Sequence, residues 1–295
     1  MNDSDASAAF QDDWLARCQE LIDKYQPQML WFDNGVNPRE YDAVKLKCAA
    51  YYNNRAAQWK KQVSIATKGS AYLAGSILDF EKAIRAPKDI LRAPWQVDDQ
   101  IATSTWGYTN DLRYRPAVSI LDELIDTVSK GGNLLLNISP KADGTIPEEQ
   151  QQILTAVGDW LKTNGEGIYG CGPWKTYGEG PVAAAAPSQT GSGPAGSGQP
   201  PANVPRPMVG MSAQKFRFTV GSETLNVFGM RRGTAEEVVI KALGKGSGAV
   251  ASVALAGSEG KLEFSQDEND LRVKVPEGAD EGLPYLLQVS GRGVV

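Results

Sequence analysis

A low-complexity tract divides this sequence into two parts with different patterns. Residues 183–207 (AAAAPSQTGSGPAGSGQPPANVPRP) consist largely of alanine, glycine, serine and proline. Such a segment cannot bury enough apolar surface to offset the conformational entropy lost on ordering. The tract therefore predicts a linker over 182–210, which separates an N-terminal domain over 1–181 from a C-terminal domain over 211–295.

The N-terminal part alternates between helical and strand patterns. Apolar periodicity and terminal proline or glycine signals predict helices over 11–25, 41–60, 116–130 and 147–162. Short apolar runs predict strands over 28–32, 63–66, 77–80 and 133–138. This order is typical of a parallel sheet covered by helices. A closed eight-stranded barrel usually needs about 250 residues, so the pattern alone leaves open a small open α/β sheet and the trailing part of a barrel.

The C-terminal part shows short strands separated by turn signals such as Gly221-Ser222. Strands are predicted over 215–220, 224–230, 237–242, 250–255, 262–266, 271–275 and 285–289. Many short strands in so few residues predict a small antiparallel β-sandwich.

Counts of residue types exclude several kinds of site. The sequence has no histidine, which excludes Ser-His-Asp and Cys-His catalysis and the usual histidine-bearing zinc sites. Its three cysteines, Cys18, Cys48 and Cys171, follow neither a metal-ligand nor a disulfide spacing, so we expect free thiols. Catalysis would then depend on carboxylates, lysine, tyrosine or a cofactor that the sequence does not reveal.

Charge and hydropathy also narrow the partners. A formal net charge of −5 argues against nucleic acid and anionic membrane surfaces, because both need a basic patch. No apolar run is long enough to span a membrane. The first ten residues, MNDSDASAAF, do not resemble a secretory signal, so a periplasmic or secreted parent protein would carry its signal upstream.

Five longer segments resemble one enzyme family, the α-L-fucosidases of glycoside hydrolase family 29. The segments are LWFDNG (30–35), AAYYNNRAAQW (49–59), PWQVDDQIATSTWGYT (94–109), LIDTVSKGGNLLLNISPKADGTIPEEQQQIL (124–154) and GDWLKTNGEGIYGCGPWKTYGEGP (158–181). Their order and spacing agree with the family, and the SKGGNLLLNISPKADGTIP stretch is the most specific.

The resemblance implies both a fold and a function. The family's barrel begins upstream of the LWFD segment with strands that carry histidines, so the expected fold is α/β followed by all-β. This means a partial (β/α)8 barrel without its first strands, followed by the sandwich. The implied activity is retaining release of terminal α-L-fucose from fucosylated oligosaccharides or glycoconjugates, with no metal or other cofactor. The alternative is an inactive remnant that binds carbohydrate.

Two carboxyl groups are needed for that chemistry, about 5 Å apart in a retaining glycosidase. Asp33 directly follows an apolar strand, and the resemblance places it at the family's nucleophile position. Glu81 follows the predicted strand 77–80 and is the candidate acid/base. Asp79 is its competitor, and it would face the same way as Glu81 only if the strand continued through both residues.

Three further residues are candidates for binding the sugar. Lys68 follows the predicted strand 63–66, where the family carries a basic residue. Trp31 precedes Asp33 by two residues and so points to the same side of the strand. Trp106 resembles the family aromatic that contacts the apolar face of fucose. Trp95 could line the same pocket but is interpreted as structural, as is the Asp98-Asp99 pair, because neighbouring residues in a strand face opposite ways.

Overall fold

The computed structural model describes residues 7–33, 36–69, 71–72, 77–180, 216–230, 237–276 and 282–295. The chain forms two compact units. One contains residues 1–85 and 91–98, and the other contains 86–90 and 99–295. The predicted linker, 182–210, lies outside the described residues, and the domain boundaries derived from the sequence stay a prediction.

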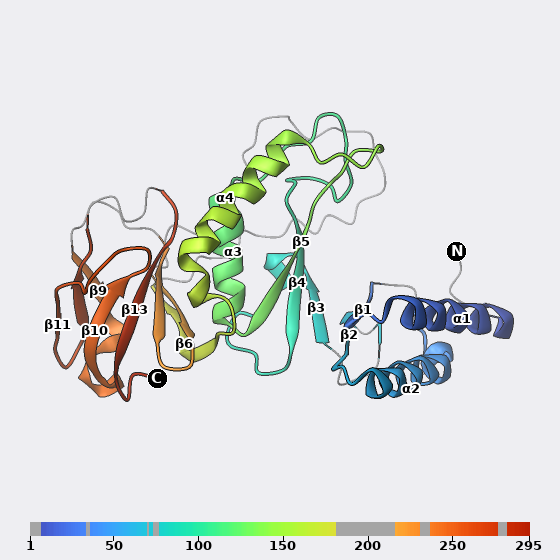
Figure 1. Ribbon diagram of the computed structural model, residues 1–295, viewed down its shortest axis with the longest axis horizontal. Coiled ribbons are helices and arrows are strands. Elements are labelled where there is room, and N and C mark those ends of the chain that lie inside the picture. The colour runs from blue at the N-terminus through green and yellow to red at the C-terminus, as the bar shows by residue number, and fades with distance from the viewer. Residues whose placement is uncertain are drawn as a thin grey trace, which may run out of the picture. The chain divides into compact units, whose positions relative to one another are not determined.

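The described residues of the first unit form two α-helices and four parallel strands (Figure 1). The helices are α1 (Ala8–Tyr25) and α2 (Asp42–Trp59), and the strands are β1 (Met29–Phe32), β2 (Ser64–Lys68), β3 (Ile77–Glu81) and β4 (Trp95–Gln100), which leaves the unit at Asp98. Each strand pairs in parallel with the next in chain order. Helix α2 supplies the crossover that the parallel pair β1–β2 needs. Among the described residues, no α-helix lies between β2 and β4.

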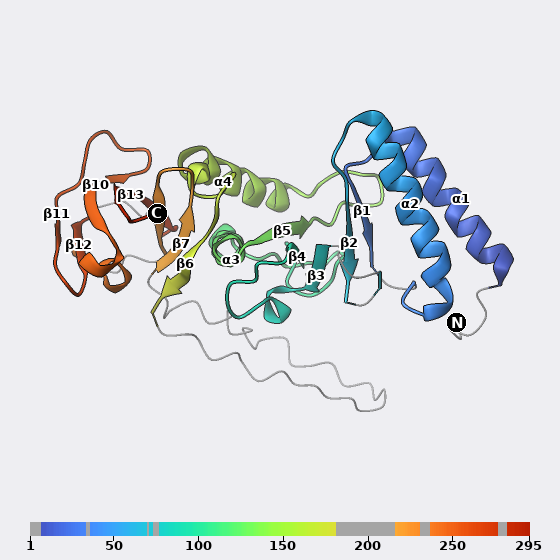
Figure 2. The ribbon, with the colours of Figure 1, turned by 90° about the horizontal axis from the view of Figure 1, so that it is seen from below.

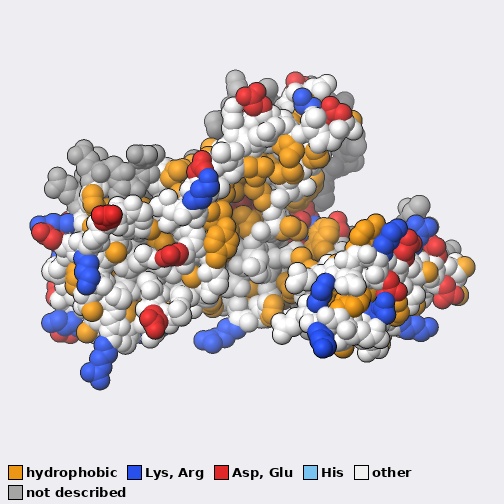
Figure 3. All heavy atoms as spheres, in the orientation of Figure 1, with side chains coloured by type: hydrophobic (Ala, Val, Ile, Leu, Met, Phe, Trp, Pro, Cys, Tyr) orange, Lys and Arg blue, Asp and Glu red, His pale blue; other side chains and the backbone are white. Residues whose placement is uncertain are grey.

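Helices α1 and α2 lie side by side and cover one face of β1 and β2 (Figure 2). Phe32 occupies the centre of this contact, with its ring 5.7 Å from that of Trp14 and 5.0 Å from that of Tyr72. Cys18, Ile22, Cys48 and Tyr52 complete the buried cluster. The outer surfaces of both helices carry charged side chains of both signs (Figure 3). The apolar pattern of α1 predicts its buried face only in part, because Cys18 and Ile22 are buried whereas Leu21 and Tyr25 remain 50% and 66% exposed.

The second unit begins with the last α/β elements. They are α3 (Ala117–Ser129), β5 (Gly132–Asn137) and α4 (Glu148–Asn164). Strand β5 follows β4 in the strand order of the parallel sheet, and within the second unit the Ile101 N–H donates to the Asn137 carbonyl at 2.9 Å. The parallel sheet, with helix α2 between β1 and β2 and helix α3 between β4 and β5, confirms the predicted partial (β/α) barrel.

Two antiparallel sheets follow. One has the strand order β10-β13-β8-β7-β6 and the other β11-β12-β9. Their bounds are β6 (Gly172–Glu179), β7 (Phe216–Val220), β8 (Leu225–Gly229), β9 (Glu237–Ile240), β10 (Ala249–Leu255), β11 (Phe264–Gln266), β12 (Leu271–Lys274) and β13 (Tyr285–Arg292). The predicted all-β part is confirmed.

The antiparallel strands enclose a buried apolar cluster, here called the sandwich core. Its members come from both sheets and include Trp174, Phe218, Val227, Ile240, Val253, Leu271 and Leu287. The other face of β8 and β13 packs against α3 and α4 through Leu121, Ile125, Trp160, Phe228 and Leu286. Strand β8 is buried along its whole length, and β13 is buried at Tyr285, Leu286, Leu287 and Val289.

Two features of the chain differ from the sequence-based expectations. Strands β4 and β6 were not predicted, because WQVDDQ and GPWKTYGE lack a clear apolar alternation. The predicted strands 63–66 and 77–80 extend further, to Lys68 and Glu81. Lys68 and Glu81 are thus the last residues of their strands and do not follow them.

Candidate active site

The parallel register of the first unit places polar side chains from four strands on one face of the sheet. Lys68 pairs with Asp79, and Glu81 pairs with Asp98. Trp31 pairs with Ala66, two residues before Lys68. Because side chains alternate along a strand, residues in register and those two apart share a face. This surface, the polar face, comprises Trp31, Asp33, Lys68, Asp79, Glu81, Gln96 and Asp98.

The Lys68 ammonium group lies at the centre of the polar face. Its Nζ atom is 3.1 Å from Asp33 Oδ1, 3.0 Å from Asp98 Oδ2 and 3.5 Å from Glu81 Oε2. These three carboxylates come from three different segments of the chain, and an ammonium has three donors to offer them. Lys68 therefore holds the Asp33 and Glu81 carboxylates close to each other.

The two partners of greatest chemical interest differ in exposure. The Asp33 side chain is 49% exposed and that of Glu81 is 29% exposed, whereas Asp98 keeps only 8%. Asp33 and Glu81 are thus open to a ligand on the side of Lys68 away from the buried Asp98. Charge-assisted contacts of this kind hold a lysine in one place far better than exposed pairs do.

Trp31 is fixed by a hydrogen bond to the same face. Its indole Nε1–H donates to Asp79 Oδ2 at 2.8 Å, and Gln96 Nε2 donates to the same oxygen. The Lys68 Nζ atom lies 5.3 Å from the centre of the Trp31 ring. Trp31 remains 38% exposed, so a large apolar ring, anchored by its one polar atom, borders Asp33 and Lys68.

The local charges shift two pKa values. Burial opposes the charged form of Lys68, but its hydrogen bonds to Asp98 and Asp33 outweigh this effect and raise its pKa. The pKa of Asp98 rises to about 6, mainly because burial penalises its charge. The neighbouring Asp79 carboxyl adds to that rise, and Lys68 opposes it. Lys68 therefore stays a cation, while Asp98 titrates near neutral pH.

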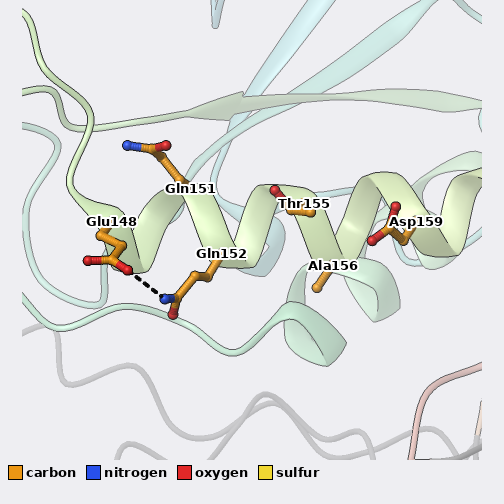
Figure 4. A pocket seen from close by; sticks show the side chains of 6 residues that line it. All are labelled: Glu148, Gln151, Gln152, Thr155, Ala156 and Asp159. Atoms are coloured by element: carbon orange, nitrogen blue, oxygen red, sulfur yellow. Dashed lines mark hydrogen bonds between the residues drawn. The ribbon is translucent and has the colours of Figure 1, made fainter.

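A shallow surface hollow lies elsewhere, along α4 in the second unit (Figure 4). It is lined by Glu148, Gln151, Gln152, Thr155, Ala156 and Asp159. Its one drawn hydrogen bond, from Gln152 Nε2 to Glu148 at 3.3 Å, joins neighbours on the helix. The lining side chains all belong to one helix and bring together no acid–base pair, so we do not regard this hollow as the site.

No group of three or more acidic, cysteine or histidine side chains within the described ranges is arranged to hold a metal ion. Among the helices that the structure describes, none is both long and apolar enough to cross a bilayer. The polar face, with four carboxylates and one lysine, is therefore the candidate site in the described part of the first unit.

Comparison with known families agrees with the sequence motifs. A family model described as Alpha-L-fucosidase matches residues 1–166, which is more than half of the chain. The chain belongs to the α-L-fucosidase family. Tissue alpha-L-fucosidase of Rattus norvegicus is 32% identical over 167 residues, which cover 54% of this chain and 36% of the relative. Plasma alpha-L-fucosidase of Homo sapiens is 32% identical over 171 residues, covering 55% and 36%.

Solved fucosidase structures share the fold over nearly the whole chain. A structure named alpha-L-fucosidase superposes with a TM-score of 0.73 at 25% identity, covering 96% of this chain and 57% of that one. A Thermotoga maritima alpha-fucosidase in complex with fucose gives a TM-score of 0.71 at 24% identity, with the same coverage. This member of the fucosidase family thus spans little more than a third of the curated relatives and over half of the solved ones.

Four of the residues that the family resemblance singled out lie together in the structure. Asp33, Lys68, Glu81 and Trp31 all lie on the polar face. Strand β3 continues through Asp79 and Glu81, so these two residues share a face, as the condition set by the sequence required. Asp79 is buried and holds Trp31 and Gln96, which leaves Glu81 as the more accessible of the two acids.

Two tryptophans are placed elsewhere. Trp95 is fully buried and packs edge-on against Phe80, on the face opposite the polar face. Trp106 belongs to the second unit, where its carbonyl accepts hydrogen bonds from Asn137 Nδ2 at 2.9 Å and Ser139 Oγ at 3.0 Å. Its predicted contact with the sugar stays a prediction.

Sequence reasoning missed Asp98. The two acids of the Asp98-Asp99 pair do point apart, since Asp98 contacts Lys68 and Asp99 lies 3.5 Å from Arg115 in the second unit. The pair is no dyad, but Asp98 belongs to the polar face by itself. Its position two residues after Gln96, in a strand that the sequence did not reveal, is the signal that alternation could have used.

Proposed function

We propose that the polar face cleaves terminal α-L-fucosides with net retention of configuration, Asp33 acting as nucleophile and Glu81 as acid/base. The observation that carries this proposal is the contact of both carboxylates with one ammonium group, at 3.1 and 3.5 Å. Since the N–H bonds of an ammonium diverge tetrahedrally, two such acceptors lie about 5 Å apart, the separation that a retaining glycosidase needs.

The chemistry follows from these positions in two steps. An Asp33 oxygen attacks the anomeric carbon while Glu81 gives its proton to the departing glycosidic oxygen, which leaves a fucosyl ester on Asp33. Glu81 then takes a proton from water, the water oxygen attacks the same carbon, and the ester bond breaks to release fucose and the Asp33 carboxylate. Two inversions give retention.

Lys68 and Trp31 have supporting roles in this proposal. The Lys68 ammonium stabilises the negative charge of Asp33 before attack and after release. Trp31 offers an exposed ring beside the nucleophile, suited to the C–H face of a deoxy sugar. Trp106 is proposed as a second aromatic contact on the grounds of the family resemblance.

The relatives support the substrate class. Two of the solved neighbours are described as complexes, one with fucose and one with 2-fluoro-fucosyl fluoride as a trapped covalent intermediate. A covalent intermediate is what a retaining mechanism requires. The substrates proposed for this chain are accordingly fucosylated oligosaccharides or glycoconjugates.

Azide rescue tests the two roles separately. With 4-nitrophenyl α-L-fucoside, Asp33→Ala should lose turnover and regain it with azide, giving the β-fucosyl azide. Glu81→Ala should regain it by giving the α-fucosyl azide, because azide then attacks the intermediate. Asp13→Asn, an exposed change on α1, is the matched control. Rescue of both variants with the same anomer would contradict the assignment.

The alternative is a chain that binds carbohydrate without cleaving it. In that case the wild-type chain would quench its tryptophan fluorescence on adding fucose but release no nitrophenol. Loss of that quenching in Asp33→Ala would show that fucose binds at the polar face, and the missing turnover of the wild type would refute the catalytic role.

A further inference from the structure

Two carboxyl groups on the polar face have no role in the proposed reaction steps. Asp79 and Asp98 are 4% and 5% exposed and lie on the neighbouring strands β3 and β4. Each has one oxygen that already accepts hydrogen bonds: Asp79 Oδ2 from Trp31 and Gln96, and Asp98 Oδ2 from Lys68. Within the part of the chain that the structure describes, the buried Oδ1 atom of each receives none.

Two buried, unsatisfied carboxylate oxygens on adjacent strands are costly if both groups are ionised. An unpaired buried oxygen loses its hydration without compensation, and two like charges at close range repel each other. The Lys68 ammonium beside Asp98 is already shared with Asp33 and Glu81. One proton held between the two Oδ1 atoms would satisfy both oxygens and remove one charge.

We propose that Asp79 and Asp98 share one proton, and that through this pair Asp98 acts as a positioning residue that fixes the Lys68 ammonium between Asp33 and Glu81. The catalytic part of this inference rests on the proposed function. The proton-sharing part rests only on the geometry of the polar face.

The surroundings of the pair are compatible with a single proton. Asp33 directly follows β1, and Lys68 is the last residue of β2. Glu81 on β3 is in register with Asp98 on β4. The main-chain N–H of Lys82 donates to the Asp98 carbonyl at 2.8 Å, which fixes the backbone at this point. The raised pKa of Asp98, to about 6, agrees with a proton held there by burial and by Asp79.

The Asp79–Asp98 pair fixes the Lys68 ammonium more firmly than exposed carboxylates could. Asp98 is the most buried of its three partners, so it defines the inner end of the ammonium site. With one proton shared, the pair attracts Lys68 with a single charge and leaves its other donors for Asp33 and Glu81. Once the proton leaves, the pair carries two charges and draws the ammonium inward.

A carboxyl titration of the folded chain tests the shared proton without any turnover. Aspartate labelled with ¹³C at the γ carbon would be followed by NMR from pH 3 to 8 in the wild type, Asp79→Asn, Asp98→Asn and the control Asp13→Asn. We expect one aspartate to titrate near pH 6 in the wild type and in the control. That signal should be absent from Asp98→Asn and should move to lower pH in Asp79→Asn.

Either of two results would overturn the shared proton: no wild-type aspartate titrating above about pH 5, or an unchanged midpoint near pH 6 in Asp79→Asn. The wild-type titration decides the first of these even if a variant fails to fold.

The positioning role has its own readout. The ¹⁵N signal of the Lys68 ammonium, identified by its loss in Lys68→Arg, should show an inflection near pH 6 in the wild type and none in Asp98→Asn. In fucoside hydrolysis, Asp98→Asn should lower kcat about tenfold with little change in KM, and should remove the component near pH 6 from the pH profile. An Asp98→Asn profile that retains this component would refute positioning.

Failure of this inference is distinguishable from failure of the proposed function. If an aspartate titrates near pH 6 but the wild type shows no turnover, the glycosidase proposal is refuted and the shared proton is still supported. Turnover that depends on Asp33 and Glu81 without that titration would sink the pair alone.

Discussion

The polar face and the sandwich core are both built from strands, but they hold opposite kinds of side chain. Every described member of the sandwich core is apolar, and many are fully buried. The polar face has four carboxylates around one lysine, and two of those carboxylates are buried. An apolar core stabilises the fold directly, whereas clustered like charges cost stability and persist where chemistry needs them. Substitutions in the sandwich core should therefore mainly lower stability, whereas substitutions of the exposed acids on the polar face should mainly lower activity.

The largest expected effect is on the polar face. Asp33→Asn keeps the shape of the nucleophile and removes its charge, so fucoside turnover should fall about 10⁴-fold or more. The side chain is 49% exposed, so the unfolding free energy should change by less than about 1 kcal/mol. Initial rates and urea unfolding measure the two quantities. A large stability loss with normal turnover would reverse the comparison.

The matching change in the sandwich core is Phe218→Ala. The Phe218 side chain is fully buried and meets the Trp174 ring edge-on at 5.3 Å. Its truncation should cost about 3–5 kcal/mol of unfolding free energy, seen in thermal or urea unfolding. Phe218→Leu should cost less than about 2 kcal/mol, because most of the volume remains. Equal losses from both variants would show that the site is not tightly packed.

Lys68→Met should fall between these two cases. It removes the ammonium that Asp33, Glu81 and Asp98 share. We expect a loss of about 3 kcal/mol at pH 8 and a smaller loss at pH 5, where Asp98, whose pKa is about 6, can take up a proton. Lys68→Arg keeps the charge and should lose less than about 1 kcal/mol. A pH-independent loss in Lys68→Met would indicate packing alone.

The last expected effect is confined to acidic pH and concerns the stability that Asp98 contributes. Its pKa of about 6 in the folded chain lies above the value of about 3.9 for an unfolded aspartate. The folded chain thus binds more protons between these pH values, so the stability that Asp98 contributes is present below about pH 4 and falls as pH rises to about 6.

The difference in unfolding free energy between the wild type and Asp98→Asn isolates this contribution. It should decline by about 3 kcal/mol across that window and stay flat above it. Asp13→Asn, which removes only an exposed pair, should show no such slope. A rise with pH in the wild-type difference would contradict the sign of the shift.

The same contrast explains what could be predicted from sequence. The helices and apolar strands of the α/β part were predictable because their periodicity reflects burial on one side, as with Phe32 under α1. The position of Asp33 directly after such a strand was predictable, whereas its role as nucleophile came from the family resemblance and stays a prediction. The short strands of the sandwich followed from turn signals and alternation, and most of them occur near their predicted bounds.

What escaped prediction depends on register between strands far apart in the sequence. Strand β4 is buried along its whole length although four of its six side chains are polar, because Gln96 meets Asp79 and Asp98 meets Lys68 and not water. Neither partner can be recognised from the WQVDDQ segment alone. The role of Asp98 required the pairing of β3 with β4, and the position of Trp31 over Lys68 required that of β1 with β2.

Covalent labelling tests the central claim most directly. The chain would be incubated with 2-fluoro-fucosyl fluoride, digested and examined by mass spectrometry. Our account predicts one fucosyl adduct on the Asp33 carboxylate, absent from Asp33→Asn and unchanged in Asp13→Asn. An adduct on another carboxylate, or no adduct on the folded wild-type chain, would contradict it.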